Sequence, residues 1–206
     1  MRKSFYAALI LYFLTFALLG QVSDRKLESF LAGKESFFLL KLEQNGREID
    51  IVDHSAHLSA GPFTLVLIYK EPIGVLVNFS LEPTLYNGFK EGKEMGEIVP
   101  DPNLFMGLAE NDFNLEDRIF IHPIAPHYLY YLDDNAHRFS QISNQAGYIE
   151  CRRKVSVFSL LESDVPPQAI SSLSGKPLYL VFQYSQWGAD WKRIVKQRDY
   201  LKISYD

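Results

Sequence analysis

The chain has 206 residues, of which 21 are basic and 25 acidic, and its formal net charge is −4. Without residues 1–20, which include Arg2 and Lys3, 19 basic residues remain and the net charge becomes −6. Nucleic-acid binding depends on Lys and Arg that neutralise phosphates, so we expect no nucleic-acid partner. The 186 residues from position 21 onward suffice for one domain with a sizeable core.

The N-terminus has the layout of a secretory signal peptide. Two basic residues, Arg2 and Lys3, precede an apolar run over residues 5–19, and Gly20 follows. A helix that spans a bilayer needs about 20 apolar residues, more than this run contains. We therefore interpret 1–20 as a cleaved signal peptide and 21–206 as a single exported β-rich domain, located in the periplasm, on the cell surface or outside the cell. The alternative is an uncleaved anchor, which would then be the only membrane contact.

Cys151 is the only cysteine, so the chain forms no internal disulfide. In an extended strand Ile149, Cys151 and Val155 share one face, which places the thiol on an apolar side. A reactive thiol needs exposure and an electropositive setting. The pattern therefore favours a buried, structural cysteine over a nucleophile.

The first predicted elements are a short helix over 23–33, ended by Gly33, and a hairpin formed by 37–43 and 47–52. Asn45-Gly46 between the two strands is the preferred pair for a type I′ turn, because both central residues need a positive φ. That turn predicts the register, listed here in pairs: Leu42 opposite Ile49, Leu40 opposite Ile51, and Lys41 opposite Asp50.

Residues 63–69 and 75–79 are apolar at nearly every position, as in strands that are covered on both faces. Residues 70–74 between them predict a second hairpin with a longer loop. Residues 82–117 contain many Gly, Pro and acidic residues, and long irregular segments are often functional. We expect binding loops there.

The rest of the chain again has the pattern of strands separated by turns. A loop with a short helix is expected over 164–175, and Leu201, Ile203 and Tyr205 alternate with polar residues as in an outer or edge strand. The similarity of 29–52 to 171–194 is interpreted as chance and not as an internal repeat. The predicted strands cover 118–122, 127–132, 148–160, 178–184 and 200–205.

These elements predict a mainly β fold, an antiparallel β-sandwich or a partly closed barrel with two short helices, preceded by the signal peptide. The sequence lacks the alternating strands and helices of a dinucleotide-binding fold. It also lacks the Gly-x-Ser-x-Gly motif of serine hydrolases and a glycine-rich phosphate loop. We therefore expect no cofactor.

The histidines are the candidates for a metal site or a catalytic base. His54, His57, His122 and His127 are suitable ligand types, but their spacings are not those of a known metal motif. We interpret them as separate surface or loop histidines and expect no metal.

Aromatic side chains are the candidates for ligand contact. Trp187 and Trp191 bracket a predicted turn, and Tyr131 lies in a predicted strand. Exposed, such rings stack on sugars or anchor a protein partner; buried, they belong to the core, which is the favoured interpretation for the strand tyrosine. The sequence predicts an exported, non-catalytic cell-envelope or secreted β-domain that binds a protein or glycan partner. The alternative is a metal-dependent or other hydrolase that uses loop histidines.

Overall fold

The structure is a computed structural model that describes residues 25–33, 36–71, 73, 75–98, 118–121, 130–132, 140–145, 147–160, 164–190 and 193–206. The predicted signal peptide over 1–20 lies outside these ranges. Export, cleavage and the boundary of the single domain therefore stay predictions.

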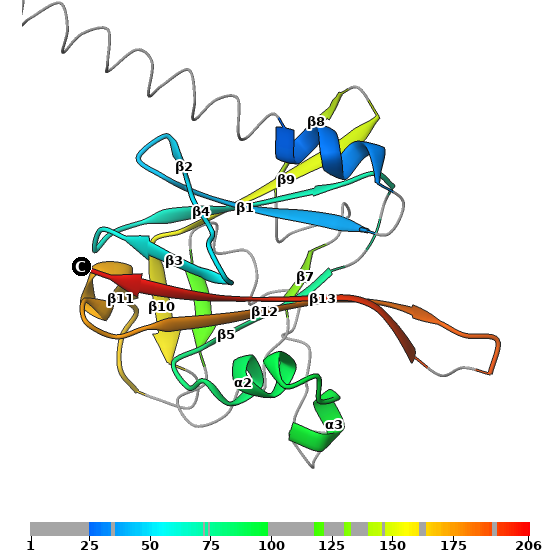
Figure 1. Ribbon diagram of the computed structural model, residues 1–206. Helices are drawn as coiled ribbons and strands as arrows, with labels where there is room; N and C mark the ends of the chain where they lie inside the picture. Colours follow the sequence, from blue (N-terminus) through cyan, green and yellow to red (C-terminus); the bar gives the residue numbers. More distant parts are fainter. Residues whose placement is uncertain are drawn as a thin grey trace, which may run out of the picture.

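The described residues form two five-stranded sheets and one small sheet (Figure 1). The first sheet has the order β2-β1-β4-β9-β8, with β1 Phe38–Gln44, β2 Arg47–Ile49, β4 Phe63–Tyr69, β8 Ser140–Gln145 and β9 Tyr148–Val155. The second sheet has the order β3-β13-β12-β5-β7, with β3 Ser55–Leu58, β5 Val75–Ser80, β7 Tyr130–Leu132, β12 Leu178–Trp187 and β13 Arg193–Tyr205. The small sheet has the order β11-β10-β6, with β6 Arg118–Ile121, β10 Val157–Leu160 and β11 Gln168–Ala169.

The mainly β prediction is confirmed, and most strand pairs are antiparallel. Two pairs, β3 with β13 and β6 with β10, are parallel. Within the described residues none of the sheets closes into a barrel, so that half of the prediction is not supported.

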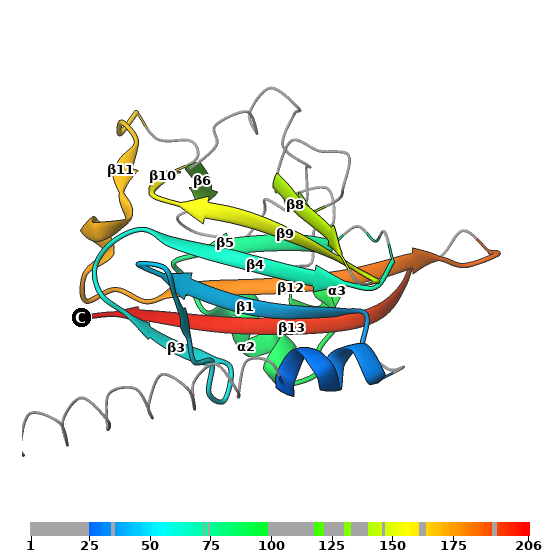
Figure 2. The ribbon, with the colours of Figure 1, turned by 90° about the horizontal axis from the view of Figure 1, so that it is seen from above.

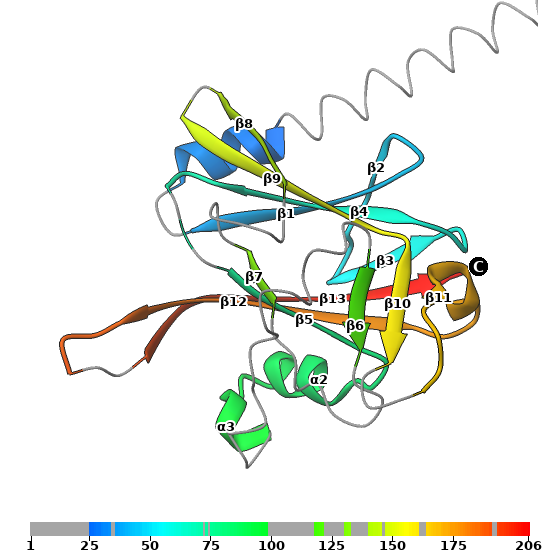
Figure 3. The same cartoon turned by 180° about the vertical axis from the view of Figure 1, so that it is seen from behind.

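The core lies between the inner faces of the two large sheets. Leu42 and Leu67 of the first sheet belong to one buried cluster with Val77, Phe182 and Leu201 of the second. The small sheet and the 3-10 helix Ile170–Leu173 add side chains to the same cluster, near the C-terminus (Figure 3). Burial of this apolar surface is the main force that holds the sheets together.

Helices cover the outer faces, giving the layers helix, sheet, sheet and helix (Figures 1 and 2). Helical residues 25–32 place Phe30 against Val66 and Ile68 of the first sheet. On the second sheet α2, Thr84–Lys90, packs against Val181, and α3, Met95–Ile98, follows it. The described helices include none with the length and apolar character that crossing a bilayer requires.

The first hairpin forms as predicted around Asn45 and Gly46, whose φ angles are 53° and 73°. Leu42 lies opposite Ile49. β2 ends at Ile49, so the predicted pairing of Leu40 with Ile51 does not form part of the sheet. Lys41 forms its ion pair with Glu48, at 3.2 Å, and not with Asp50. The chain leaves the first sheet here because a tight turn over 52–55 redirects it into β3 of the second sheet.

The predicted second hairpin is wrong. β4 pairs with β1 and β9 in the first sheet, whereas β5 pairs with β12 and β7 in the second. Both strands are apolar on both faces, so their sequences carry no signal for a particular neighbour. The short connection between them crosses from one sheet to the other.

Three further boundaries differ from prediction. Residues 148–160 form two strands, β9 and β10, which separate at Ser156 and enter different sheets. The expected irregular segment 82–117 contains α2, whose Leu85 and Phe89 lie one turn apart and face the second sheet. β13 begins at Arg193, and its last residues, Lys202–Tyr205, pair with β3 on the side away from β12, so the segment predicted as an edge strand lies inside the sheet.

The segments 29–52 and 171–194 have different sheet positions. β1 lies between β2 and β4, which both follow it in the chain, whereas β12 lies between the earlier β5 and the later β13. The strand orders thus agree with a chance similarity.

Candidate functional site

A groove of about 430 Å³ lies where an edge of the first sheet meets an edge of the second, and we call it the seam groove. Residues 38–41 of β1 have β4 on one side, but β2 begins to pair only at Leu42. Likewise β13 has β3 as a neighbour only from Lys202 to Tyr205. The groove is lined by Lys26, Ser36, Phe38, Leu39, Leu40, Ile51, Asp53, His54, Gln197, Asp199 and Tyr200.

Gln197 of β13 bridges the two sheets at this groove. Its Oε1 accepts hydrogen bonds from the backbone N–H of Phe37 at 2.6 Å and of Phe38 at 3.1 Å. Its Nε2 donates to the carbonyl oxygen of Phe38 at 3.0 Å. A carboxamide offers the same donor and acceptor as a peptide group. The side chain of Gln197 therefore stands where the backbone of a neighbouring strand would pair with Phe38.

Leu40 is the next residue whose backbone faces the groove. The N–H and C=O groups of one strand residue point to the same side, and successive residues alternate. Since the groups of Phe38 face Gln197, those of Leu40 face the groove as well. Among the described residues no strand pairs with Leu40 on that side.

His54 is oriented by two acceptors on β13. Its Nδ1 lies 3.1 Å from Asp199 Oδ1 and 3.1 Å from the carbonyl oxygen of Tyr200. Both partners accept, so Nδ1 carries the hydrogen and Nε2 of the neutral ring is left as an acceptor. The ring stacks on Tyr200 with centroids 4.0 Å apart, and 47% of the His54 side chain is exposed. This arrangement suits hydrogen bonding to a ligand or proton transfer.

The turn that carries His54 is locally unfavourable. Asp53 and His54 have φ angles of 47° and 57°, a left-handed conformation that costs a residue with a Cβ roughly 1–2 kcal/mol. Two 2.9 Å backbone bonds between Val52 and Ser55 close the turn, and Lys202 N–H donates to the His54 carbonyl at 2.8 Å. These contacts hold His54 against β13.

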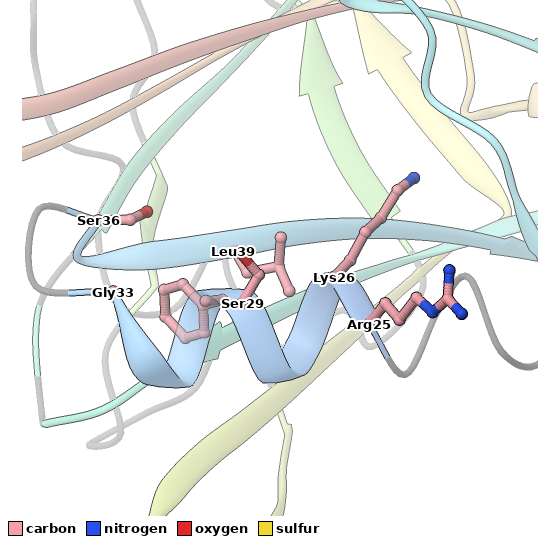
Figure 4. A pocket seen from close by; sticks show the side chains of 7 residues that line it. Arg25, Lys26, Ser29, Gly33, Ser36 and Leu39 are labelled. Carbon is pink, nitrogen blue, oxygen red and sulfur yellow. The ribbon is translucent and has the colours of Figure 1, made fainter.

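A second cavity, of about 500 Å³, adjoins the seam groove beside helical residues 25–32, and we call it the helix pocket (Figure 4). Lys26, Ser36 and Leu39 line both spaces. Among the described residues, its lining includes the cations Arg25 and Lys26 and no carboxylate. The helix pocket is lined by Arg25, Lys26, Ser29, Phe30, Gly33, Ser36 and Leu39.

The histidine candidates do not form one cluster in the part of the chain that is described. His54 lines the seam groove, whereas His57 is exposed on β3 opposite Ser204. Over the described ranges, no three His, Cys, Asp or Glu side chains are close enough to hold a metal ion. His122 and His127 lie outside those ranges.

Two of the three aromatic candidates, Trp187 and Tyr131, lie on the second sheet. Trp187 ends β12 opposite Arg193, in a hairpin arm that extends beyond the rest of the domain (Figure 2). It therefore belongs to a strand and not to a turn. Tyr131 lies in β7 opposite Leu76, and Trp191 lies outside the described residues.

Cys151 is fully buried, as the alternation predicts, and its Sγ lies 2.7 Å from the hydroxyl of Tyr69. The polar residues that build the seam groove, Gln197 and Asp199, were not singled out by the sequence. Their partners lie about 150 residues away, and no local motif marks them.

The fold and site define a mainly β domain with layered helices and a groove at an open sheet seam. No protein-family model matches the sequence, and no curated protein matches it.

Proposed function

We propose that the protein is an exported, non-catalytic domain of the cell envelope or the secreted fraction that binds a partner protein in the seam groove. The observation that carries the proposal is the composition of this groove. Leu40 and Ile51 offer apolar surface, and Gln197, His54 and Asp199 place polar groups beside it. Apolar surface with a few oriented polar groups is characteristic of binding sites.

Export rests on the basic, apolar and small residues of the N-terminus. The test is fractionation of the expressing cells with mass spectrometry of the protein's N-terminus. We expect the exported protein to begin at Gln21. A chain that begins at Met1 would contradict cleavage, and a purely cytosolic chain would contradict export.

The binding site is tested by selecting a displayed random-peptide library on the wild-type protein, with a glycan array in parallel. Leu40→Arg places a large cation in the groove, and Val165→Arg adds the same side chain at an exposed site that does not line it. We expect selected peptides to bind the wild type and Val165→Arg but not Leu40→Arg. Peptides that bind all three equally contradict the proposal.

A glycan that binds the wild type and is lost with Leu40→Arg would assign the groove to a sugar and overturn the protein partner. Circular dichroism melting of each variant ensures that lost binding reflects the groove and not unfolding.

A hydrolase is the second candidate, favoured by the pairing of His54 with Asp199. A histidine whose Nδ1–H is held by a carboxylate leaves Nε2 ready to act as a general base, which contributes roughly 10²–10⁴-fold to a rate. Chromogenic esters, phosphoesters and amides are assayed with wild type, His54→Ala and His57→Ala. Turnover that is lost only in His54→Ala would support the enzyme, and rates equal to buffer in all three would contradict it.

A further inference from the structure

Resting on the proposed function, we infer that the partner enters the seam groove as an extended peptide, which adds a strand to the unpaired edge of β1. Strand addition takes its affinity from main-chain hydrogen bonds and its specificity from alternate side chains. The edge of β1, the position of Gln197 and the charges of the helix pocket each support this mode.

The groove continues the row of positions that β2 occupies. Leu42 and Gln44 lie opposite Ile49 and Arg47 of β2, and Phe38 is held by Gln197. Leu40 lies between them, with its N–H and C=O facing the seam groove, which Ile51 and His54 of the chain after β2 also line. A peptide backbone in this space extends the sheet without changing β1.

Gln197 acts as a replaceable partner for this edge. Its carboxamide makes one accepted and one donated bond with Phe38, the pair that a peptide residue would make. When a peptide takes over both bonds, its next groove-facing residue reaches Leu40 at the same time. Gln197 thus protects the edge in the free protein and is displaced on binding.

The side chains of the peptide meet different surroundings on the two faces of the sheet. On the inner face lie Leu40 and Ile51, which pack against the core. On the outer face lies the helix, with Arg25 and Lys26 at the helix pocket (Figure 4). Since successive strand residues point to opposite faces, apolar side chains on the inner face alternate with side chains that reach the helix pocket, where Arg25 and Lys26 favour acidic residues. Asp53 and Asp199 also line the seam groove, so the acidic preference applies only to side chains that reach the helix pocket.

The probe is a fluorescein-labelled seven-residue peptide in which valine and glutamate alternate, titrated by fluorescence anisotropy. Two twins carry N-methyl groups on the first, third and fifth residues or on the second, fourth and sixth. Only alternate residues of an added strand bond to β1, so one twin loses its bonds and the other keeps them. We expect the twin that loses its bonds to β1 to bind at least about tenfold more weakly than the twin that keeps them.

Gln197→Ala removes the partner that must be displaced. We expect it to bind the peptide at least about threefold more tightly than wild type, because the peptide no longer has to displace the hydrogen bonds of Gln197 to Phe37 and Phe38. Lys196→Ala, an exposed neighbour on β13, is the matched control and leaves affinity unchanged. We expect a peptide with lysine in place of glutamate to bind more weakly, because Arg25 and Lys26 attract glutamate and repel lysine.

The results separate this inference from the proposed function. Equal affinity of the two N-methylated twins, or weaker binding by Gln197→Ala, overturns strand addition. So does a lack of binding by the alternating peptide up to about 1 mM, the range of very weak complexes. Selected peptides that depend on Leu40 would still support the groove as the binding site. A dimer in sedimentation that Leu40→Arg abolishes would make a second copy the occupant and overturn the inference.

Discussion

The side-chain amide of Gln197 on β13 is bonded to both backbone groups of Phe38 on β1, across a separation of 159 residues. Through these bonds the second sheet holds an unpaired edge of the first at the seam groove. The bridge has consequences for stability that are independent of any ligand.

Gln197→Ala is expected to destabilise the fold by about 1–3 kcal/mol, because it removes four hydrogen bonds with a net value near 1 kcal/mol each, partly replaced by water. Urea unfolding followed by circular dichroism measures the change. Lys196→Ala is the control and should stay within about 0.5 kcal/mol of wild type, as exposed substitutions usually do. Equal midpoints for the two variants would show that the bridge adds no stability.

His54 is expected to carry its hydrogen on Nδ1 when the ring is neutral, because Asp199 and the Tyr200 carbonyl both accept from that nitrogen. Long-range ¹H–¹⁵N correlation spectra of the imidazole rings identify the tautomer. Asp199→Ala should raise the population with hydrogen on Nε2, whereas exposed His57 should not change. A wild-type His54 with its hydrogen on Nε2 would contradict the geometry and weaken the case for a general base.

Tyr205 is expected to make the fold sensitive to alkali. Burial raises the pKa of its hydroxyl above the usual value of 10.0. Above pH 10 the unfolded chain therefore loses the proton while the folded chain keeps it. The contribution of Tyr205 to the free energy of unfolding is present below pH 10 and is lost as pH rises above it. The free energy of unfolding then falls by up to about 1.4 kcal/mol per pH unit.

Tyr205→Phe should reduce this slope without abolishing it, because burial also raises the pKa of half-buried Tyr179. At neutral pH the variant should be as stable as wild type or slightly more stable, since the hydroxyl is buried with no hydrogen-bond partner among the described residues. Urea midpoints at pH 7 and between pH 9 and 11 test both points. A loss of stability at pH 7 would reveal a partner for the hydroxyl.

Cys151 is expected to react with a thiol reagent only when the protein unfolds, because its side chain has no exposed surface. Labelling with an aromatic disulfide reagent should be slow in buffer and rapid in urea. The control combines Cys151→Ala with Lys196→Cys, which places the single thiol at an exposed site and should label at once. Fast labelling of the native wild type would show that the core around Tyr69 opens readily.

The hairpin at Asn45 and Gly46 and the buried side of Cys151 could both be predicted because they depend on adjacent residues. A positive φ preference and a two-residue alternation are properties of a short segment. The end of β2 could not be predicted in this way. Its position depends on the turn at Asp53 and His54, whose unfavourable φ angles are stabilised by bonds to β13.

The pairing of the long apolar strands could not be predicted either. β4 and β5 are adjacent in the chain and similar in composition, yet they lie in different sheets. The strand expected over 148–160 divides at Ser156 for the same reason: either half can be covered on both faces, and the choice of neighbour follows from packing of the whole core.

By itself the sequence determined that this is a mainly β protein, where its first hairpin turns, that it has no disulfide, and that its N-terminus has the layout of an export signal. Those properties arise from composition and from residues close together in the chain. Only the tertiary structure decided which strands share a sheet and that Gln197 meets Phe38 and His54 meets Asp199. These pairs are separated by 159 and 145 residues, so their meeting depends on how the sheets pack and not on any local pattern.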